Sequence, residues 1–350
     1  MGSTPPLFRR QASRLPRSLQ AFIGFFGLAL VLSGCGGGPT VATSTGRILY
    51  VATTSGIYGF SIMSTGTLDP LSTQPLVTNS GILQIAATPG IPSGQTGPLL
   101  LAATGSASVP AWTIGSGGSL TAVSAFESCT SSVTGLTVTS DSQYLILTDG
   151  TASSSSSNIG LIPFSKTTSC TTGSTSSSAY PLEPAIDCAV SGSSPCILFL
   201  TASSTSTTST LSLTTPQEIP VSPSQTAPFL PPLTTSFACT QQACPLGVAF
   251  DPTTVFFYAS FTGTNPPTLQ SIAPNTKVAT AQVTFPPTAP VNYPCVDTIG
   301  GVVYTPSANG FLYATQTNAS GGLTGATTVV TPSSLPAPLA MLSCAVVANP

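Results

Sequence analysis

Short apolar runs recur along the chain between Arg47 and Pro350, separated by segments rich in Ser, Thr, Gly and Pro. The runs consist of aliphatic, β-branched and aromatic residues, and they have the length of strands buried on both faces. No stretch after Cys35 repeats with a period of 3.6 residues, and the density of Thr, Val, Ser and Pro disfavours helix. The pattern predicts an all-β fold.

The apolar runs are regularly spaced. The strongest are Ile48–Val51, Leu99–Leu101, Tyr144–Leu147, Ile197–Leu200, Val255–Tyr258 and Val302–Tyr304. Five steps lead from Leu49 to Val303, so the repeat is about 51 residues, within the range of propeller blades. Each later run follows a shorter apolar segment that ends in turn residues: QIAATP at Gln84, GLTVTSDS at Gly135, CAVSGS at Cys188, GVAFDP at Gly247 and CVDTIGG at Cys295. These pairs are typical of hairpins.

A glycine-containing turn keeps the same period. It occurs as MSTGTLDPL at Met63, IGSGGSLTAV at Ile114 and NASGGLTGA at Asn318. Gly118 and Gly322 are 204 residues apart, or four repeats of about 51. Glycine at such positions supplies the positive φ that hairpin turns require.

The two ends of the repeated region complement each other. The chain ends in CAVVANP at Cys344, which matches the first strand of a repeat, and ILYV at Ile48 matches a second strand that lacks a first. Together they complete one blade, as in rings that are closed by strands from both termini. The prediction is a β-propeller of six four-stranded blades over residues 47–350. The long, proline-rich segment from Pro195 to about Thr253 leaves a seventh blade open.

The succession ILYV, IYGFSI and STGTLDPL resembles the lactonase-like and YVTN-type β-propellers of bacteria. The resemblance implies a propeller fold over the region from Arg47 to Pro350, usually with seven blades, and lactonase chemistry as one function to consider. A string of immunoglobulin-like sandwiches, which are also rich in Thr and Val, is the alternative architecture.

The N-terminus has the organisation of an export signal. Four arginines precede an apolar run of twelve residues, Ala21–Leu32, which is short for a membrane span. The sequence Leu32, Ser33, Gly34, Cys35 resembles the lipobox of bacterial lipoprotein signal peptides. The resemblance implies a signal peptide over residues 1–34, lipid on Cys35 and a flexible tether over 35–46. Gly36, in place of the aspartate associated with inner-membrane retention, favours the outer membrane. A plain secretory signal and a short uncleaved anchor are the alternatives.

Charge is scarce in this chain. Charged residues make up 5% of it, and only Arg47, Lys166 and Lys277 are basic after Cys35, against nine acidic residues. The mature chain therefore has a net charge of −6 and offers no basic face for nucleic acid. We expect a monomer whose surface is solvated mainly by hydroxyl groups.

Eight cysteines remain after Cys35: Cys129, Cys170, Cys188, Cys196, Cys239, Cys244, Cys295 and Cys344. An even number of cysteines in an exported chain predicts disulfides. The pairing we expect is Cys188–Cys196, Cys239–Cys244, Cys295–Cys344 and Cys129–Cys170. The chain has no histidine and no CxxC, so we expect no metal site and no cofactor.

Catalytic candidates are few. The nine carboxylates are scattered singly, and a serine triad needs the histidine that the chain lacks. Asp141 and Asp251 follow inner strands, where a side chain that caps its own turn is the simplest interpretation. Asp187 and Asp297 lie on or beside inner strands and are the candidates for carboxylates facing the channel. Six tyrosines fall mostly within predicted strands and are expected to pack in the core: Tyr50, Tyr58, Tyr144, Tyr258, Tyr304 and Tyr313.

The residues thus favour a lipid-anchored envelope protein whose propeller binds a protein, peptide or polysaccharide without catalysis. A lactonase-like hydrolase or isomerase is the alternative function. The convergence of Asp187, Asp297 and Arg47 on one channel mouth would favour the enzyme.

Overall fold

A computed structural model describes the fold of this chain. The described residues are 42–71, 74–79, 81–128, 132–138, 142–148, 158–165, 171–174, 179–186, 196–205, 208–218, 234–239, 247–251, 253–254, 256–261, 266–273, 278–331, 335 and 339–348. Ser44–Pro350 forms a compact unit separate from Met1–Thr43.

The described secondary structure is almost entirely β. The elements, in chain order, are β1 (Ser44–Thr53), β2 (Gly56–Met63), β3 (Leu68–Pro70), β4 (Val77–Thr78), β5 (Gln84–Ala87), β6 (Leu99–Ala103), β7 (Ser108–Ile114), the 3-10 helix η1 (Ser116–Gly118), β8 (Leu120–Glu127), β9 (Gly135–Val138), β10 (Tyr144–Thr148), β11 (Asn158–Pro163), β12 (Thr171–Ser174), β13 (Ala179–Ile186), β14 (Cys196–Thr205), β15 (Thr208–Glu218), β16 (Thr234–Cys239), β17 (Gly247–Asp251), β18 (Phe256–Phe261), β19 (Thr268–Ala273), β20 (Val278–Thr284), β21 (Cys295–Asp297), β22 (Val302–Pro306), β23 (Leu312–Thr317), β24 (Leu323–Val329) and β25 (Met341–Ala348).

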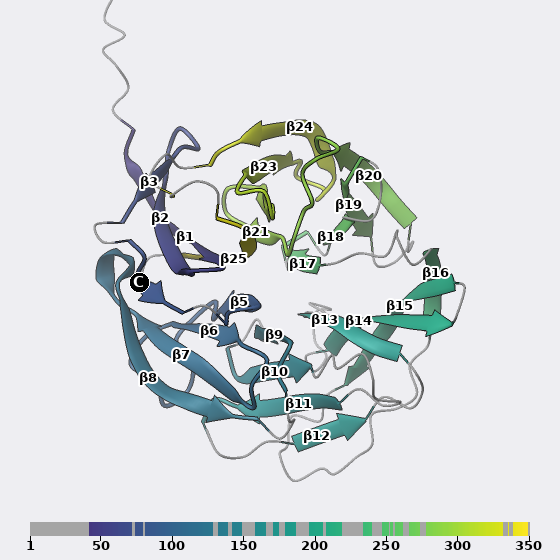
Figure 1. Cartoon of the computed structure of the whole chain (residues 1–350), viewed down its shortest axis with the longest axis horizontal. Coiled ribbons are helices and arrows are strands. Elements are labelled where there is room, and N and C mark those ends of the chain that lie inside the picture. The colour runs from purple at the N-terminus through teal and green to yellow at the C-terminus, as the bar shows by residue number, and fades with distance from the viewer. Residues whose placement is uncertain are drawn as a thin grey trace, which may run out of the picture. The chain divides into compact units, whose positions relative to one another are not determined.

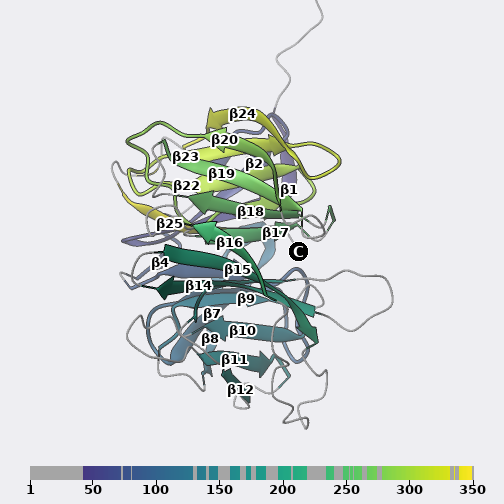
Figure 2. The ribbon, with the colours of Figure 1, turned by 90° about the vertical axis from the view of Figure 1, so that its right-hand side faces the viewer.

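The strands form antiparallel sheets arranged as a β-propeller. Five sheets take four consecutive strands each: β5–β8, β9–β12, β13–β16, β17–β20 and β21–β24. A further sheet has the order β25-β1-β2-β3, with β4 also paired to β2. The first strand of each sheet contacts the first strand of the next, in the order β25, β5, β9, β13, β17, β21 and back to β25. Figure 1 shows these six strands around the centre, and Figure 2 shows strands running from one face of the ring to the other.

The expected pairing of the two chain ends is confirmed. β25 pairs antiparallel with β1, with Tyr50 opposite Ala345 and Val51 opposite Cys344. β25 therefore occupies the first-strand position and β1 the second-strand position of one sheet, as the sequence predicted. β1 begins at Ser44, three residues before the predicted start of the domain.

The six strong apolar runs coincide with the second strand of a sheet, apart from Val255, which lies outside the described residues: β1, β6, β10, β14, β18 and β22. Every residue of β6, β10 and β22 is buried. Apolar clusters pack between neighbouring sheets, for example between the β25-β1-β2-β3 sheet and β21–β24, and between β5–β8 and β9–β12. These strands are covered on both faces, and this explains why they appear as continuous apolar runs rather than alternating patterns.

One first strand lies elsewhere than the sequence suggested. The expected segment began at Cys188, but the first strand of that sheet is β13, which ends at Ile186. Residues 187–195 lie outside the described residues. β13 contains two prolines, which mask the apolar pattern on which the prediction relied.

The recurrent glycine turns contact the preceding sheet. The hydroxyl of Tyr50 donates to the carbonyl of Gly118 at 3.0 Å, and that of Tyr258 donates to the carbonyl of Gly321 at 2.9 Å. Both glycines have φ of +79°. The glycine equivalent to Gly118 is therefore Gly321, one residue before the Gly322 that the repeat predicted.

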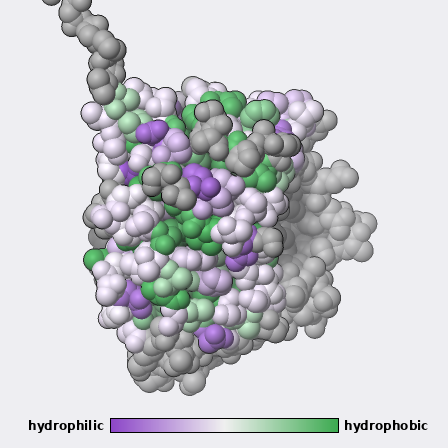
Figure 3. Space-filling view, turned by 60° about the vertical axis from the view of Figure 1, so that its left-hand side comes forward, coloured by the Kyte–Doolittle hydropathy of each residue, from purple (hydrophilic) through white to green (hydrophobic). Residues whose placement is uncertain are grey.

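The surface reflects the composition. Figure 3 shows one side of the molecule, which is mostly pale, with separate hydrophobic and hydrophilic patches among residues of intermediate hydropathy. This agrees with a chain in which hydroxyl groups rather than charges solvate the surface.

Candidate functional site: the central cavity and the contacts around β21

A cavity of about 190 Å³ lies between the inner strands β5, β9, β17, β21 and β25. Its described lining is mostly apolar, with Gln84 and Thr137 as the polar side chains. None of the lining residues that the structure describes is charged. The wall therefore offers no acid, base or cation from this part of the chain.

Polar side chains at the wall join neighbouring inner strands. The backbone N–H of Ile85 in β5 donates to the Ser343 hydroxyl of β25 at 3.2 Å. The backbone N–H of Leu136 in β9 donates to the Gln84 carbonyl oxygen at 2.8 Å. Ser343 and Gln84 hold equivalent positions, one residue before a buried apolar or cysteine residue of their strands. Each accepts a hydrogen bond from one backbone N–H at the edge of the next inner strand.

The disulfide Cys295–Cys344 joins β21 to β25, with the two Cα atoms 5.5 Å apart. Both cysteines are buried, and both line the cavity. This is one of the four pairings expected from the sequence. The other cysteines lie outside the described residues, or in β14 and β16, whose side chains the structure does not describe.

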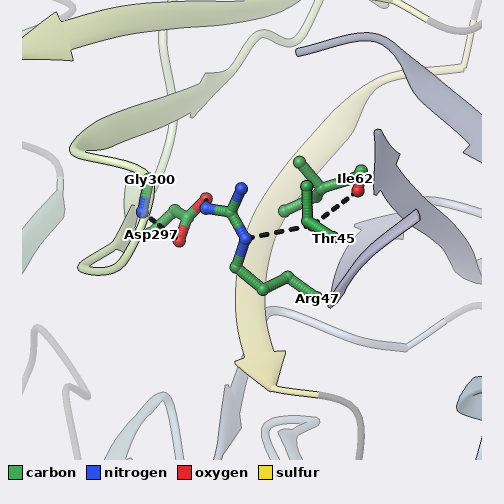
Figure 4. A network of polar contacts seen from close by, with 5 residues as sticks. All are labelled: Thr45, Arg47, Ile62, Asp297 and Gly300. Atoms are coloured by element: carbon green, nitrogen blue, oxygen red, sulfur yellow. Dashed lines mark hydrogen bonds and ion pairs between the residues drawn. The ribbon is translucent and has the colours of Figure 1, made fainter. Parts of the chain in front are cut away.

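Asp297, which is buried, and Arg47, which is partly buried, form an ion pair between β21 and β1 (Figure 4). Asp297 also accepts a hydrogen bond from the backbone N–H of Gly300 at 2.9 Å. Arg47 Nε donates to the Thr45 hydroxyl at 3.1 Å, and that hydroxyl donates to the carbonyl of Ile62 at 2.6 Å. Each polar group is held by another, so this network positions β1 against the end of β21.

The space around this ion pair is closely filled. A Cβ on Gly300 would overlap both the Arg47 guanidinium and the Asp297 carboxylate. Tyr304 lies nearby on β22, and its pKa is raised to about 12, mainly by burial and then by the charge of Asp297, while Arg47 lowers it. Two of the three residues singled out as enzyme candidates thus meet, but they pair with each other and do not line the cavity.

Asp251 caps its own turn, which confirms the simpler of its two interpretations. Its carboxylate accepts from the Thr253 N–H at 2.9 Å, from the Thr253 hydroxyl at 2.6 Å and from the Thr254 hydroxyl at 2.8 Å. The side chain is buried. A carboxylate with three such donors is held in a structural role.

The remaining predicted residues cannot be placed. Asp141, Asp187 and the lipobox residues Leu32, Ser33, Gly34 and Cys35 lie outside the described residues. Within the described residues, no group of three His, Cys, Asp or Glu side chains could hold a metal ion. No helix in that part of the chain is long and apolar enough to cross a membrane.

The sequence did not single out Gln84 or Ser343. The available signal was weak: each is a polar residue directly before an apolar or cysteine residue in a predicted first strand. Their role depends on the strand of the neighbouring sheet, about one repeat away in the ring. The residue pattern within one strand does not indicate which strand will lie next to it in the ring.

Comparisons with solved structures agree with the propeller fold. A chain in the crystal structure of a nidogen/laminin complex superposes with a TM-score of 0.53 at 11% identity, covering 86% of this chain and 98% of that one. A putative 6-phosphogluconolactonase from Bacteroides uniformis superposes with a TM-score of 0.50 at 12% identity, covering 86% and 99%. No protein-family model matches the chain, and no curated protein sequence matches it. At this identity the likeness concerns the fold alone.

Proposed function

We propose that this protein is an exported, lipid-anchored envelope protein whose propeller is a noncatalytic platform for a protein, peptide or polysaccharide. One observation carries the noncatalytic part. The cavity wall is built from apolar side chains and from polar groups that join the inner strands, and the buried carboxylates Asp251 and Asp297 are both held in structural contacts. A hydrolytic site needs a free base or a cation, and the described residues of this wall supply neither.

We infer that the ring has six blades, of which one is assembled from both chain ends. The circular order of contacts among β25, β5, β9, β13, β17 and β21 supports this number. The pairing of β25 with β1 supports the shared blade. Such closure makes a rigid scaffold because no sheet edge at the centre of the ring is left without a neighbour.

A lactonase-like enzyme is the second candidate, and the likeness to a putative 6-phosphogluconolactonase favours it. A fold shared at 12% identity does not carry chemistry with it. An anionic sugar lactone also calls for cationic side chains, and the mature chain has only three. One of these, Arg47, is already paired with Asp297.

Hydrolysis of δ-gluconolactone and of its 6-phosphate by the purified protein tests the choice between the two functions. We expect rates equal to those in buffer, both for the protein and for an Asp251→Asn variant. Hydrolysis above the buffer rate that disappears in Asp251→Asn would overturn the noncatalytic proposal, because the Asp251 carboxylate would then take part in the reaction.

Lipid anchoring at Cys35, with the outer membrane as the destination, rests on the lipobox and the export signal. The disulfide Cys295–Cys344 supports an oxidising compartment. Cys35→Ala, or treatment of the cells with globomycin, should leave an unprocessed precursor without lipid, detected by intact mass. Normal processing of the Cys35→Ala chain would contradict this part of the proposal.

A further inference from the structure

Two turns that follow inner strands present highly exposed isoleucines. Ile299, in the turn between β21 and β22, is 74% exposed, and Ile91, in the loop between β5 and β6, is 60% exposed. Single exposed apolar residues are ordinary on protein surfaces. What distinguishes these two is their position relative to the start of β1.

Both turns lie on the face of the ring where β1 begins. Tyr293 and Ser343 form a parallel bridge, and Ser343 also bonds to Ile85, so β21, β25 and β5 lie side by side. These strands end at one edge of the ring, where β25 pairs Ala348 with Arg47. The ion pair of Arg47 with Asp297 places the turn of Ile299 beside the first residues of β1. We call this the proximal face, defined by Ser44–Arg47, residues 297–301 and residues 88–98.

The distance from Cys35 to the ring is limited by covalent geometry. Ser44 lies nine positions after Cys35, and this segment reaches about 32 Å when fully extended. β1 has ten residues and therefore crosses the ring over about 33 Å. A chain anchored at Cys35 would need its full extension, directed around the rim, to bring the opposite face to the membrane. The proximal face meets the membrane with no such extension.

The chemistry of the proximal face suits a lipid surface. Residues 88–98 contain no charged side chain, and residues 297–301 contain only Asp297, which Arg47 neutralises. Neither segment presents an unpaired charge, and exposed isoleucines gain free energy in the interfacial region. The other exposed large apolar side chains of the described chain lie on the opposite face: Leu83 directly precedes β5, Phe311 directly precedes β23, and Val329 ends β24.

We propose that the proximal face lies against the lipid bilayer, with Ile91 and Ile299 in its interfacial region. The propeller is then held at the membrane in one orientation, and the opposite face is presented to partners. This inference rests on the proposed lipid anchor at Cys35. It adds which face of the propeller contacts the bilayer and which residues make that contact.

The test uses the full lipidated protein in vesicles of phosphatidylethanolamine and phosphatidylglycerol, with and without brominated acyl chains. Ile299→Trp reports on the proximal face, and Phe311→Trp is the matched control at the opposite end of β22. Buried Trp112, the only natural tryptophan, gives the background in the parent protein. We expect brominated lipid to quench Trp at position 299 with a blue-shifted emission, and to leave Trp at position 311 unchanged.

Intact mass of the same samples separates the two ways of failing. Where Cys35 carries lipid, the proposed orientation is wrong in any of three cases: both tryptophans are quenched, neither is quenched, or only the one at position 311 is quenched. The lipid anchor is then still correct. If Cys35 carries no lipid, the anchor itself is wrong and the orientation falls with it. Should Ile299→Trp fail to fold, Ile91→Trp makes the same measurement from the other turn, with the same outcomes deciding.

Discussion

Two neighbouring sheets build their inner pair of strands in different ways. β21 and β22 form a hairpin joined by a short turn, with three paired residues. β25 and β1 lie about 290 positions apart in the sequence and pair over seven residues without any turn. Bringing distant segments together costs more conformational entropy than closing a short turn. The longer register is one compensation for that cost.

The second compensation is that both strands of the turnless pair are attached to β21. The disulfide Cys295–Cys344 attaches β25, and the ion pair Arg47–Asp297 attaches β1. Apolar side chains of β1, including Leu49, pack with residues of β22 and β25 in one cluster. The hairpin is held together by its turn, whereas ring closure is supported by cross-links from the adjacent sheet.

Removing β25 should have the largest effect. A chain that ends before Met341 leaves β1 without its inner partner, and we expect it to lose the cooperative unfolding transition, because the loss approaches the whole stability of about 5–15 kcal/mol of a typical domain. Thermal unfolding followed by circular dichroism measures this. A synthetic peptide of residues 341–350 should restore the transition when added. A truncated chain that melts like its parent would show that closure is dispensable.

Breaking the ion pair between Arg47 and Asp297 should have the second-largest effect on stability. Arg47→Met leaves the Asp297 carboxylate buried without its cation, and we expect a loss of about 3–5 kcal/mol in the free energy of unfolding. The double variant Arg47→Met, Asp297→Asn removes the stranded charge, and it should be more stable than the single variant. Urea denaturation compares the three proteins. Equal midpoints for all of them would mean that β1 is held by its pairing and apolar packing alone.

Removing the disulfide should lower the free energy of unfolding somewhat less than breaking the ion pair. Replacing both Cys295 and Cys344 by Ser frees β25 from β21, and we expect a loss of about 2–4 kcal/mol, because the bond no longer restricts the unfolded chain. Both are replaced together so that no new free thiol can mispair. The same urea experiment applies, with the parent as control. Unchanged stability would assign the attachment of β25 to the apolar cluster.

The smallest expected effect on stability concerns Tyr304, which lies in β22 of the β21–β22 hairpin. A tyrosine titrates near pH 10 in the unfolded chain, whereas burial, followed by Asp297, raises the pKa of Tyr304 to about 12 in the fold. The unfolded state therefore binds fewer protons between these values. The stability contribution is complete below about pH 10 and is lost as the pH rises toward about 12.

Tyr304→Phe should reduce the alkaline loss of stability in urea titrations at several pH values, while Tyr258, whose pKa burial also raises to about 12, retains its own contribution. A parent protein whose unfolding midpoint does not change between about pH 9 and 12 would contradict the raised pKa.

Much of the fold was predictable because each strand is a short segment that its own residue pattern identifies. Runs such as Ile48–Val51 and Val302–Tyr304 are apolar throughout, since sheets cover both of their faces, and a window of a few residues detects them. The match of CAVVANP with ILYV was predictable for the same reason. The first strand placed at Cys188 was wrong because the prolines of β13 interrupt the apolar pattern. The functions of Asp187 and Cys35 stay predictions.

Residue types and their spacing were enough to predict the all-β class, the period of the repeat, the complementary ends and the scarcity of charge. Each of these follows from residue type and spacing along the chain. Only the tertiary structure decided that Asp297 pairs with Arg47, that Gln84 and Ser343 bond to the next inner strands, and that Ile91 and Ile299 share the face where β1 begins. These facts depend on which segments become neighbours when the ring closes, and residues 250 positions apart in the chain carry no local signal of that contact.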